Sequence, residues 1–267
     1  WILRATSSRD GRVHGNVNTQ GTVTGRMTAS QPNLQQVSGD KRARALFIPK
    51  ESWIQVGVDA SGLEARLLAS RMARWDKGSF AEQVLHEDIH TVNQQAAGLP
   101  DRDSAKTFFY ALIYGAGDRK IGQIVGSGPK KGKEIKAKYL DSMPALKQLL
   151  ANVEWQVNHK GTITLLDGRE VPCRAAHKAL NVQLQGDGAM IMKLAQVLFY
   201  RSLKPFRLQV RFMATVHDEW QLECDPIIAD IVGSLGCQAI KQAGEILGCN
   251  IIMDGEYRVG KNWSECH

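Results

Sequence analysis

The segment RFMATVHDEWQLEC, residues 211–224, consists of two apolar runs separated by His217 and Asp218. Strand-like runs on both sides of a two-residue break predict an antiparallel hairpin. Asp218 is then expected at the tip of this hairpin, with Glu219 beside it. The segment therefore predicts a sheet that presents carboxylates at one of its edges.

A second apolar strand also leads into a carboxylate. The run WIQVGV, residues 53–58, alternates as a strand does and is followed by Asp59 and by a helix with a leucine-rich stripe. The other expected elements are short antiparallel strands within 11–28, mainly helical structure over 77–165, a long helix over 181–203, hairpin strands over 211–216 and 219–224, a helix over 227–247 and a last strand near Ile251. Strands at both ends of the chain with helices inserted between them predict an α+β fold.

Two interpretations of the aspartates remain open at this point. Asp59 and Asp218 at one sheet edge can hold a pair of divalent cations that lower the pKa of an attacking hydroxyl and stabilise a leaving oxygen in phosphoryl transfer. Carboxylate oxygens suit Mg²⁺. Alternatively, Asp59 or Ser61 caps the helix that follows the strand.

The segment RDSAKTFFYALIYG, residues 102–115, predicts a helix with one unusual face. Arg102, Lys106, Tyr110 and Tyr114 follow one another at intervals of four residues and so share that face. A guanidinium, an ammonium and two phenols in line suit a triphosphate followed by a sugar and a base. The alternative is a solvated basic face with tyrosines packed on the core.

Two neighbouring features also have two interpretations each. The run EDIH ends at His90, which is either a ligand near the same helix or a structural histidine. The lysine-rich stretch 126–138 is either a solvated helix face, which we favour, or a contact with the backbone of a polyanionic partner.

Composition excludes several classes of protein. The 267 residues include 34 Lys and Arg against 27 Asp and Glu, a net charge of +7 that weakly indicates a polyanionic partner. The hydrophobic fraction of 43% argues against disorder, and no apolar run reaches the roughly 18 residues of a membrane span. The five cysteines form no CxxC pair, which argues against zinc or disulfide frameworks and fits a reducing cytoplasm. Trp1 and the residues after it show no signal-peptide pattern.

Five blocks in this order resemble the family A (DNA polymerase I-like) DNA polymerases, and most closely the replicative polymerases of short-tailed bacteriophages. The blocks are TGR at 24–26 with PNLQ at 32–35, VDASGLE at 58–64 (motif A), residues 102–115 (motif B, on the O helix), ALN at 179–181 with Gln185, and VHDE at 216–219 (motif C). The match extends from about Arg12 to GKNW at 260–263.

The resemblance implies the palm and fingers portion of a right-hand polymerase. Residues 1–72 and 181–267 would form an antiparallel-sheet palm and residues 73–180 an inserted helical fingers subdomain, with thumb and exonuclease domains absent. The implied activity is that of a DNA-directed DNA polymerase, which adds deoxynucleotides to a primer 3′-OH by two-metal nucleotidyl transfer. The implied partners are primer-template DNA, dNTPs and an upstream polypeptide carrying the thumb and exonuclease domains, in the cytoplasm of a bacterial host during phage infection. No membrane is implied. Whether the chain is a split subunit or a fragment stays open.

The resemblance also assigns roles to individual residues. The metal ligands would be Asp59, Asp218 and the carbonyl of Ala60, which hold two Mg²⁺ ions, with Glu219 as a supporting catalytic carboxylate. Nucleotide binding would fall to Arg102 and His90 at the outer phosphates, Lys106 as a catalytic residue at the inner ones, Tyr110 at the sugar and Glu64 as a steric gate that can also bond Tyr110. DNA contacts would come from Arg26, Asn33, Tyr114, Asn181, Gln185 and His217.

Two rival functions are compatible with parts of this pattern. A single-subunit RNA polymerase shares the palm and the basic helix, but Glu64 opposes it because an enzyme that accepts ribose needs a small side chain there. A catalytically idle nucleic-acid-binding fragment is the other rival, and the intact Asp59, Asp218, Arg102 and Lys106 argue against it.

Overall fold

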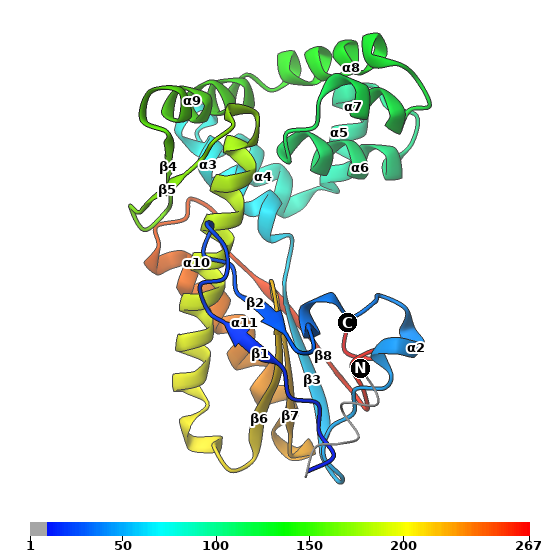
Figure 1. Ribbon diagram of the computed structural model, residues 1–267, viewed down its shortest axis with the longest axis vertical. Helices are drawn as coiled ribbons and strands as arrows, with labels where there is room; N and C mark the ends of the chain where they lie inside the picture. The colour runs from blue at the N-terminus through cyan, green and yellow to red at the C-terminus, as the bar shows by residue number, and fades with distance from the viewer. Residues whose placement is uncertain (1–9) are drawn as a thin grey trace. The chain divides into compact units, whose positions relative to one another are not determined.

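The computed structural model describes residues 10–267 (Figure 1). The chain forms two compact units. The sheet unit comprises the described residues up to Leu63 together with Gly188–Gly248 and Ile252–His267, and the helical unit comprises Glu64–Asp187 and Cys249–Ile251. The first palm segment was expected from residue 1, and its first nine residues lie outside the described part of the chain. The units divide at 63/64 and 187/188, whereas the expected subdomain boundaries were 72/73 and 180/181.

The sheet unit is built on four antiparallel strands in the order β6-β7-β3-β8. Their bounds are Val210–Val216 for β6, Glu219–Cys224 for β7, Ile54–Ala60 for β3 and Gly255–Gly260 for β8. A separate two-stranded ribbon pairs β1 (Asn16–Asn18) with β2 (Thr28–Ser30). The short helices of this unit are η1 (Leu34–Gln36), α2 (Lys41–Arg44), η3 (Lys204–Phe206) and η4 (Pro226–Ile228). The expected hairpin is confirmed to within one residue.

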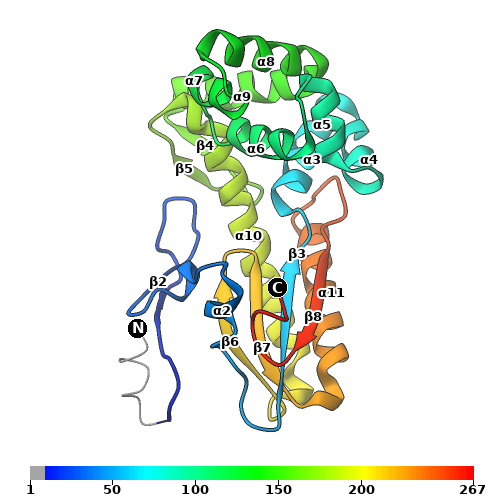
Figure 2. The ribbon, with the colours of Figure 1, turned by 90° about the vertical axis from the view of Figure 1, so that its right-hand side faces the viewer.

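One face of the sheet packs on α11 (Ala229–Ile246) and on the part of α10 (Ala179–Ser202) that belongs to this unit, which Figure 2 shows behind the strands. Val58 and Trp220, paired across β3 and β7, are both completely buried. The Trp220 ring lies 5.3 Å from that of Phe199 on α10, and Gly236 leaves room on α11 for Val58. This apolar layer is the core that fixes the position of the strands.

The opposite face of β3 and β7 is polar although it is buried. Gln55, Gln221 and Glu223 are all at most 1% exposed. The Gln55 side chain donates to Gln221 Oε1 at 2.6 Å, and Arg12 forms an ion pair with Glu223 at 2.9 Å. Hydrogen bonding and charge pairing make this burial tolerable. The polar row runs along the sheet toward Asp59 and Glu219.

The helical unit contains helices packed around an aromatic core. The elements are α3 (Leu63–Asp76), α4 (Ser79–His86), α5 (Ile89–Ala97), α6 (Arg102–Ile113), α7 (Asp118–Ile124), α8 (Pro129–Ser142), α9 (Pro144–Lys160), the hairpin β4 (Thr162–Thr164) and β5 (Glu170–Pro172), η2 (Ala176–Lys178) and the start of α10. Phe108 of α6 meets Tyr139 of α8 edge to face at 5.1 Å, and Tyr139 donates to Asn93 of α5 at 2.8 Å. Asp187 accepts a two-pronged hydrogen bond from Arg71 at 2.7 Å, which ties α10 to α3.

Two details of the sequence-based prediction need revision. The last strand was expected near Ile251, and that position was wrong. Ile251 is buried ahead of the strand, and β8 begins at Gly255, because the ladder to β3 starts with the pair Ala60–Gly255. The β4–β5 hairpin was also not anticipated, since each of its strands has only three residues. The α+β class itself is confirmed.

The cysteines have the environment expected of residues in a folded interior. All five cysteines are free, and Cys173, Cys224 and Cys266 are buried. Burial is the largest cause of a raised thiol pKa in four of the five cysteines. The pKa is raised to about 11 for Cys224, Cys237 and Cys249 and to about 12 for Cys266.

Over residues 10–267, the structure contains no helix with the length and apolar character of a membrane span.

Candidate active site

The carboxylates predicted from the hairpin and from β3 come together at one end of the sheet. Asp59 pairs across the ladder with Glu219 on β7 and with Glu256 on β8. The N–H of Ala60 donates to the carbonyl of Asp218 at 3.0 Å, which ties the hairpin tip to the end of β3. Asp59 lies inside the strand, and the next helix begins only at Leu63, so this aspartate is not the residue that precedes the helix. The geometry favours the interpretation in which both aspartates serve chemistry.

The charged groups that shift the pKa of Asp59 are all negative. Burial, followed by repulsion from Asp218, Glu219 and Glu256, raises the pKa of Asp59 to about 7. A cation at this edge would relieve the repulsion. Within residues 10–267 no group of three or more His, Cys, Asp or Glu side chains forms a ready metal cage. Two aspartates and the carbonyl of Ala60 fit Mg²⁺, which commonly binds through one or two carboxylates and completes its shell with water and substrate phosphate.

Glu219 is fixed more firmly than its neighbours. It is 4% exposed, and its Oε1 accepts hydrogen bonds from Gln221 at 2.5 Å and from the indole N–H of Trp263 at 2.7 Å. His267 Nδ1 lies 3.0 Å from Oε2. Sequence reasoning did not assign Gln221, Trp263 or His267 to the site. The period-two alternation of β7 could have placed Gln221 on the face of Glu219, but no sequence signal connects the two C-terminal residues with it.

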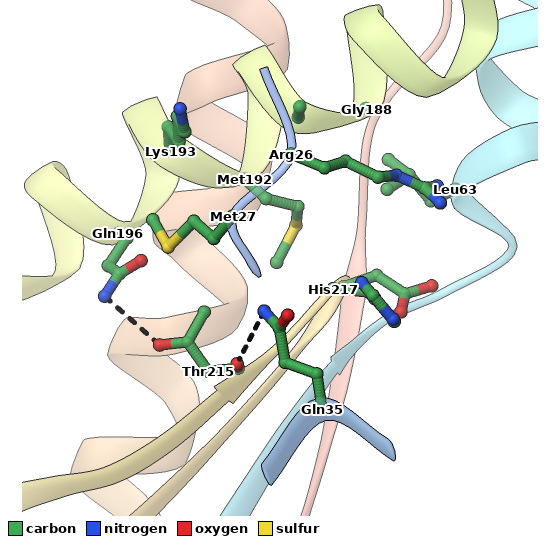
Figure 3. Close-up of a pocket in the computed structure, with 12 residues that line it drawn as sticks. Arg26, Met27, Gln35, Leu63, Gly188, Met192, Lys193, Gln196, Thr215 and His217 are labelled. Atoms are coloured by element: carbon green, nitrogen blue, oxygen red, sulfur yellow. Dashed lines mark hydrogen bonds between the residues drawn. The ribbon is translucent and has the colours of Figure 1, made fainter. Parts of the chain in front are cut away.

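A narrow pocket adjoins Asp218 (Figure 3). It is lined by residues from α10, from the hairpin and from the segment before η1, including the predicted DNA contacts Arg26 and His217. Gln35 and Gln196 hold Thr215 through hydrogen bonds of 3.4 and 3.3 Å. Burial and then the charge of Arg26 lower the pKa of His217, whose backbone adopts a positive φ of 53°. A histidine in this sparsely populated conformation at the hairpin tip is a feature typical of functional sites.

The other predicted DNA contacts are more dispersed. The Asn33 side chain caps η1 by accepting from the N–H of Gln35 at 3.0 Å. Asn181 and Gln185 lie one turn apart on the part of α10 that belongs to the helical unit, and both are half-buried. The Oδ1 of Asn181 is buried with no hydrogen-bond partner among the described residues.

The basic helix has the predicted start, end and face. Asp101 caps α6 by accepting from the N–H of Ser104 at 2.7 Å, and Gly115 after the helix has φ of 77°. Arg102 and Lys106 are exposed, and Tyr114 is 42% exposed. The opposite face is buried at Ala105, Phe108, Phe109, Leu112 and Ile113. The tyrosines therefore do not serve as the core face of this helix.

His90 and Glu64 lie beside this face within the helical unit. The His90 ring lies 6.1 Å from the Tyr110 ring, and burial followed by the charge of Arg102 lowers the pKa of His90. Glu64 accepts hydrogen bonds from Tyr114 Oη at 2.6 and 2.8 Å. The sequence-based prediction allows a bond between Glu64 and Tyr110, and Tyr114 lies one helical turn after Tyr110. The structure thus brings His90, Arg102, Tyr110 and the Glu64–Tyr114 pair together in one unit.

Comparison with known proteins shows which family this sequence resembles. The model of the family described as DNA polymerase family A matches residues 2–265. The DNA-directed DNA polymerases of Enterobacteria phage T3 and Escherichia phage T7 are each 42% identical over 97% of this chain. The chain spans 42% of the length of each of these phage polymerases.

A solved structure shows the same fold. The POL domain of Pol1 from M. smegmatis, determined in complex with DNA primer-template and dNTP, superposes with a TM-score of 0.88. It is 24% identical in sequence, and the match covers 99% of this chain and 50% of that one. These comparisons confirm the family resemblance that the ordered motifs indicated. The chain belongs to DNA polymerase family A.

Proposed function

We propose that this chain is the palm and fingers part of a DNA-directed DNA polymerase, which extends a primer 3′-OH with deoxynucleotides in a template-directed reaction. The observation that carries the proposal is the carboxylate cluster at the end of β3, where Asp59 and Asp218 lie at one sheet edge and Asp59 has a pKa of about 7. The finer subdomain boundaries expected from the sequence remain part of this proposal.

Asp59, Asp218 and the carbonyl of Ala60 would hold two Mg²⁺ ions. When bound, such a pair activates the primer hydroxyl and stabilises the leaving oxygen of the nucleotide. Glu219, fixed by Gln221 and Trp263, supplies a further negative charge at a set position. The chain's own contribution is to keep these carboxylates in place before the substrates arrive.

The exposed face of α6 would bind the incoming nucleotide. Arg102 and His90 take the outer phosphates, and Lys106 neutralises charge on the inner ones as the leaving group departs. Tyr110 packs on the sugar. Glu64 excludes a ribose 2′-hydroxyl, and its bonds from Tyr114 hold the carboxylate in one orientation.

The primer-template would be held by groups that do not read sequence. Arg26, Asn181 and Gln185 suit the minor groove, where acceptors are nearly the same for all base pairs. Asn33 and His217 are proposed to contact the primer strand, and Tyr114 to stack at the templating position. Since the chain spans 42% of the length of the phage relatives, we propose that synthesis also requires a thumb-bearing upstream polypeptide. We propose that this activity takes place in the cytoplasm of a bacterial host during phage infection, and the similarity to phage polymerases supports this proposal.

Primer extension tests the proposal. The chain is assayed with Mg²⁺, dNTPs and a labelled primer-template, first alone and then fused behind the upstream portion of the phage T7 polymerase, with Asp59→Ala and Asp218→Ala as controls. We expect Mg²⁺-dependent, template-directed extension that both substitutions abolish. Extension by either variant at the unsubstituted rate, or an inactive fusion beside an active T7 enzyme, would overturn the proposal. Parallel reactions with NTPs in place of dNTPs distinguish DNA synthesis from RNA synthesis.

A further inference from the structure

Asp88 is the common partner of the two helix starts that carry the proposed phosphate ligands. It is the N-cap of α5, where it accepts from the N–H of His90 at 3.2 Å and from the Thr91 hydroxyl at 2.9 Å. It also accepts from Arg102 of α6, at 2.5 Å from Nε and 3.1 Å from Nη2. Both helices belong to the helical unit and lie against each other (Figure 1). One carboxylate thus joins the first turn of α5 to the first turn of α6.

The pairing fixes the orientation of the Arg102 guanidinium. Asp88 receives Nε and Nη2 as a fork, which holds the guanidinium plane in one rotation. Nη1 makes no hydrogen bond to any residue within 10–267 and keeps its two donors. Arginine has five donors in a fixed plane, so Arg102 can keep Asp88 on one edge and take phosphate oxygens on the other.

The same carboxylate keeps its charge at every working pH. The hydrogen bonds from Arg102 hold the pKa of Asp88 far below its usual range. The side chains of Arg102 and Asp88 are 51% and 42% exposed, so the pair adds little to folding stability. Because the two-pronged pair contributes little to stability, we expect its main effect to be on the orientation of the Arg102 side chain.

We propose that Asp88 is a positioning residue, which orients Arg102 and the His90 end of α5 for binding the triphosphate of the incoming nucleotide. The inference rests on the proposed function, because it takes Arg102 and His90 as phosphate ligands. The opposite role is simple competition, in which the Asp88 charge occupies Arg102 and weakens triphosphate binding. The two roles predict changes of opposite sign when the charge is removed.

The variant Asp88→Asn separates the fork from the helix cap. Asparagine caps helices as well as aspartate does, but its amide offers one oxygen where the fork needs two acceptors. Thr91→Val is the matched control, since it removes a different hydrogen bond to the same carboxylate and leaves the fork intact. Arg102→Ala reports what the arginine itself contributes. Melting temperatures of all variants are measured first, and we expect Asp88→Asn and Thr91→Val to match the unsubstituted chain.

Binding of inorganic tripolyphosphate, measured by calorimetry on this chain, needs neither DNA nor an upstream polypeptide. We expect Asp88→Asn to weaken tripolyphosphate binding roughly three- to tenfold and Thr91→Val to leave it unchanged. The double variant Asp88→Asn/Arg102→Ala should bind no more weakly than Arg102→Ala alone. In the fused enzyme, Asp88→Asn is expected to raise the KM for dNTP by a similar factor while kcat changes less than twofold.

The outcomes distinguish this inference from the proposed function. If Arg102→Ala binds tripolyphosphate as well as the unsubstituted chain does, the phosphate site on α6 is refuted, and the inference with it. If Arg102→Ala weakens binding and Asp88→Asn does not, only the positioning role is overturned. Tighter binding by Asp88→Asn also overturns it and establishes competition.

Discussion

Replacing Asp59 with asparagine should stabilise this protein in the absence of divalent cations. Burial and the surrounding carboxylates raise the pKa of Asp59 to about 7, from the ordinary value of 3.8 for an aspartate. Because the folded state has the higher pKa, it keeps its proton while the unfolded chain loses its own. Stability contributed by this group is therefore lost as the pH rises from about 4 to about 7. Asparagine carries no charge and does not incur this loss.

The size of the effect follows from the pKa shift. A pKa that differs by about three between the folded and unfolded states corresponds to ~4 kcal/mol, because each tenfold change in proton affinity is worth ~1.4 kcal/mol. Asp59 is only half-buried, so solvent screening reduces the expected gain to about 2 kcal/mol. For a chain of this size, that gain raises the unfolding midpoint by about 3–4 °C.

Thermal unfolding followed by circular dichroism in EDTA measures this difference. At about pH 8 the Asp59→Asn variant should unfold at the higher temperature, and at about pH 4 the two midpoints should converge. Mg²⁺ should raise the midpoint of the unsubstituted chain more than that of the variant. Glu256→Gln serves as the matched control and should give a smaller gain, because Glu256 is the weakest of the three repulsive neighbours. A variant midpoint at or below the unsubstituted one at pH 8 would refute the reasoning.

Three further predictions concern the fused enzyme. Asp59→Ala or Asp218→Ala should lower primer extension by at least ~10²–10³-fold while leaving DNA binding in gel-shift assays nearly unchanged; loss of DNA binding together with synthesis would contradict the metal assignment. Tyr110→Phe should raise the preference for dNTP over ddNTP roughly 2- to 10-fold, since the phenol can replace the hydrogen bond of a missing 3′-hydroxyl. Single-nucleotide incorporation measures this preference, and an unchanged ratio of dNTP to ddNTP incorporation would exclude this role of Tyr110. Glu64→Ala should raise ribonucleotide incorporation roughly 5- to 100-fold by relieving a clash with the ribose 2′-hydroxyl. Alkaline cleavage of the product measures its ribonucleotide content, and an unchanged content would locate the steric gate elsewhere.

Local patterns in the sequence account for most of the fold and for the aspartates and the basic helix face of the candidate site. Alternation around a two-residue break defined the hairpin at 211–224, and four-residue spacing defined the exposed face of α6, because both signals depend only on near neighbours. The start of β8 was misplaced because Ile251 is apolar and buried while the ladder begins at Gly255.

Contacts between distant parts of the chain could not be predicted from one sequence. Asp88 and Arg102 are 14 residues apart and meet only because α5 packs on α6. Trp263 reaches Glu219 across 44 residues. Such contacts depend on how elements pack, which periodicity does not encode.

The low reactivity expected of the native thiols gives this protein a practical advantage for spectroscopy. Thiolates are the reactive form of cysteine, and four of the five native thiols have pKa values of about 11 or 12. The fifth, Cys173, is buried. A cysteine introduced at an exposed position should therefore react with a maleimide dye much faster than any native one. One dye placed in the sheet unit and one in the helical unit would form a donor–acceptor pair, and energy transfer between them would follow the separation of the two units as nucleotide binds.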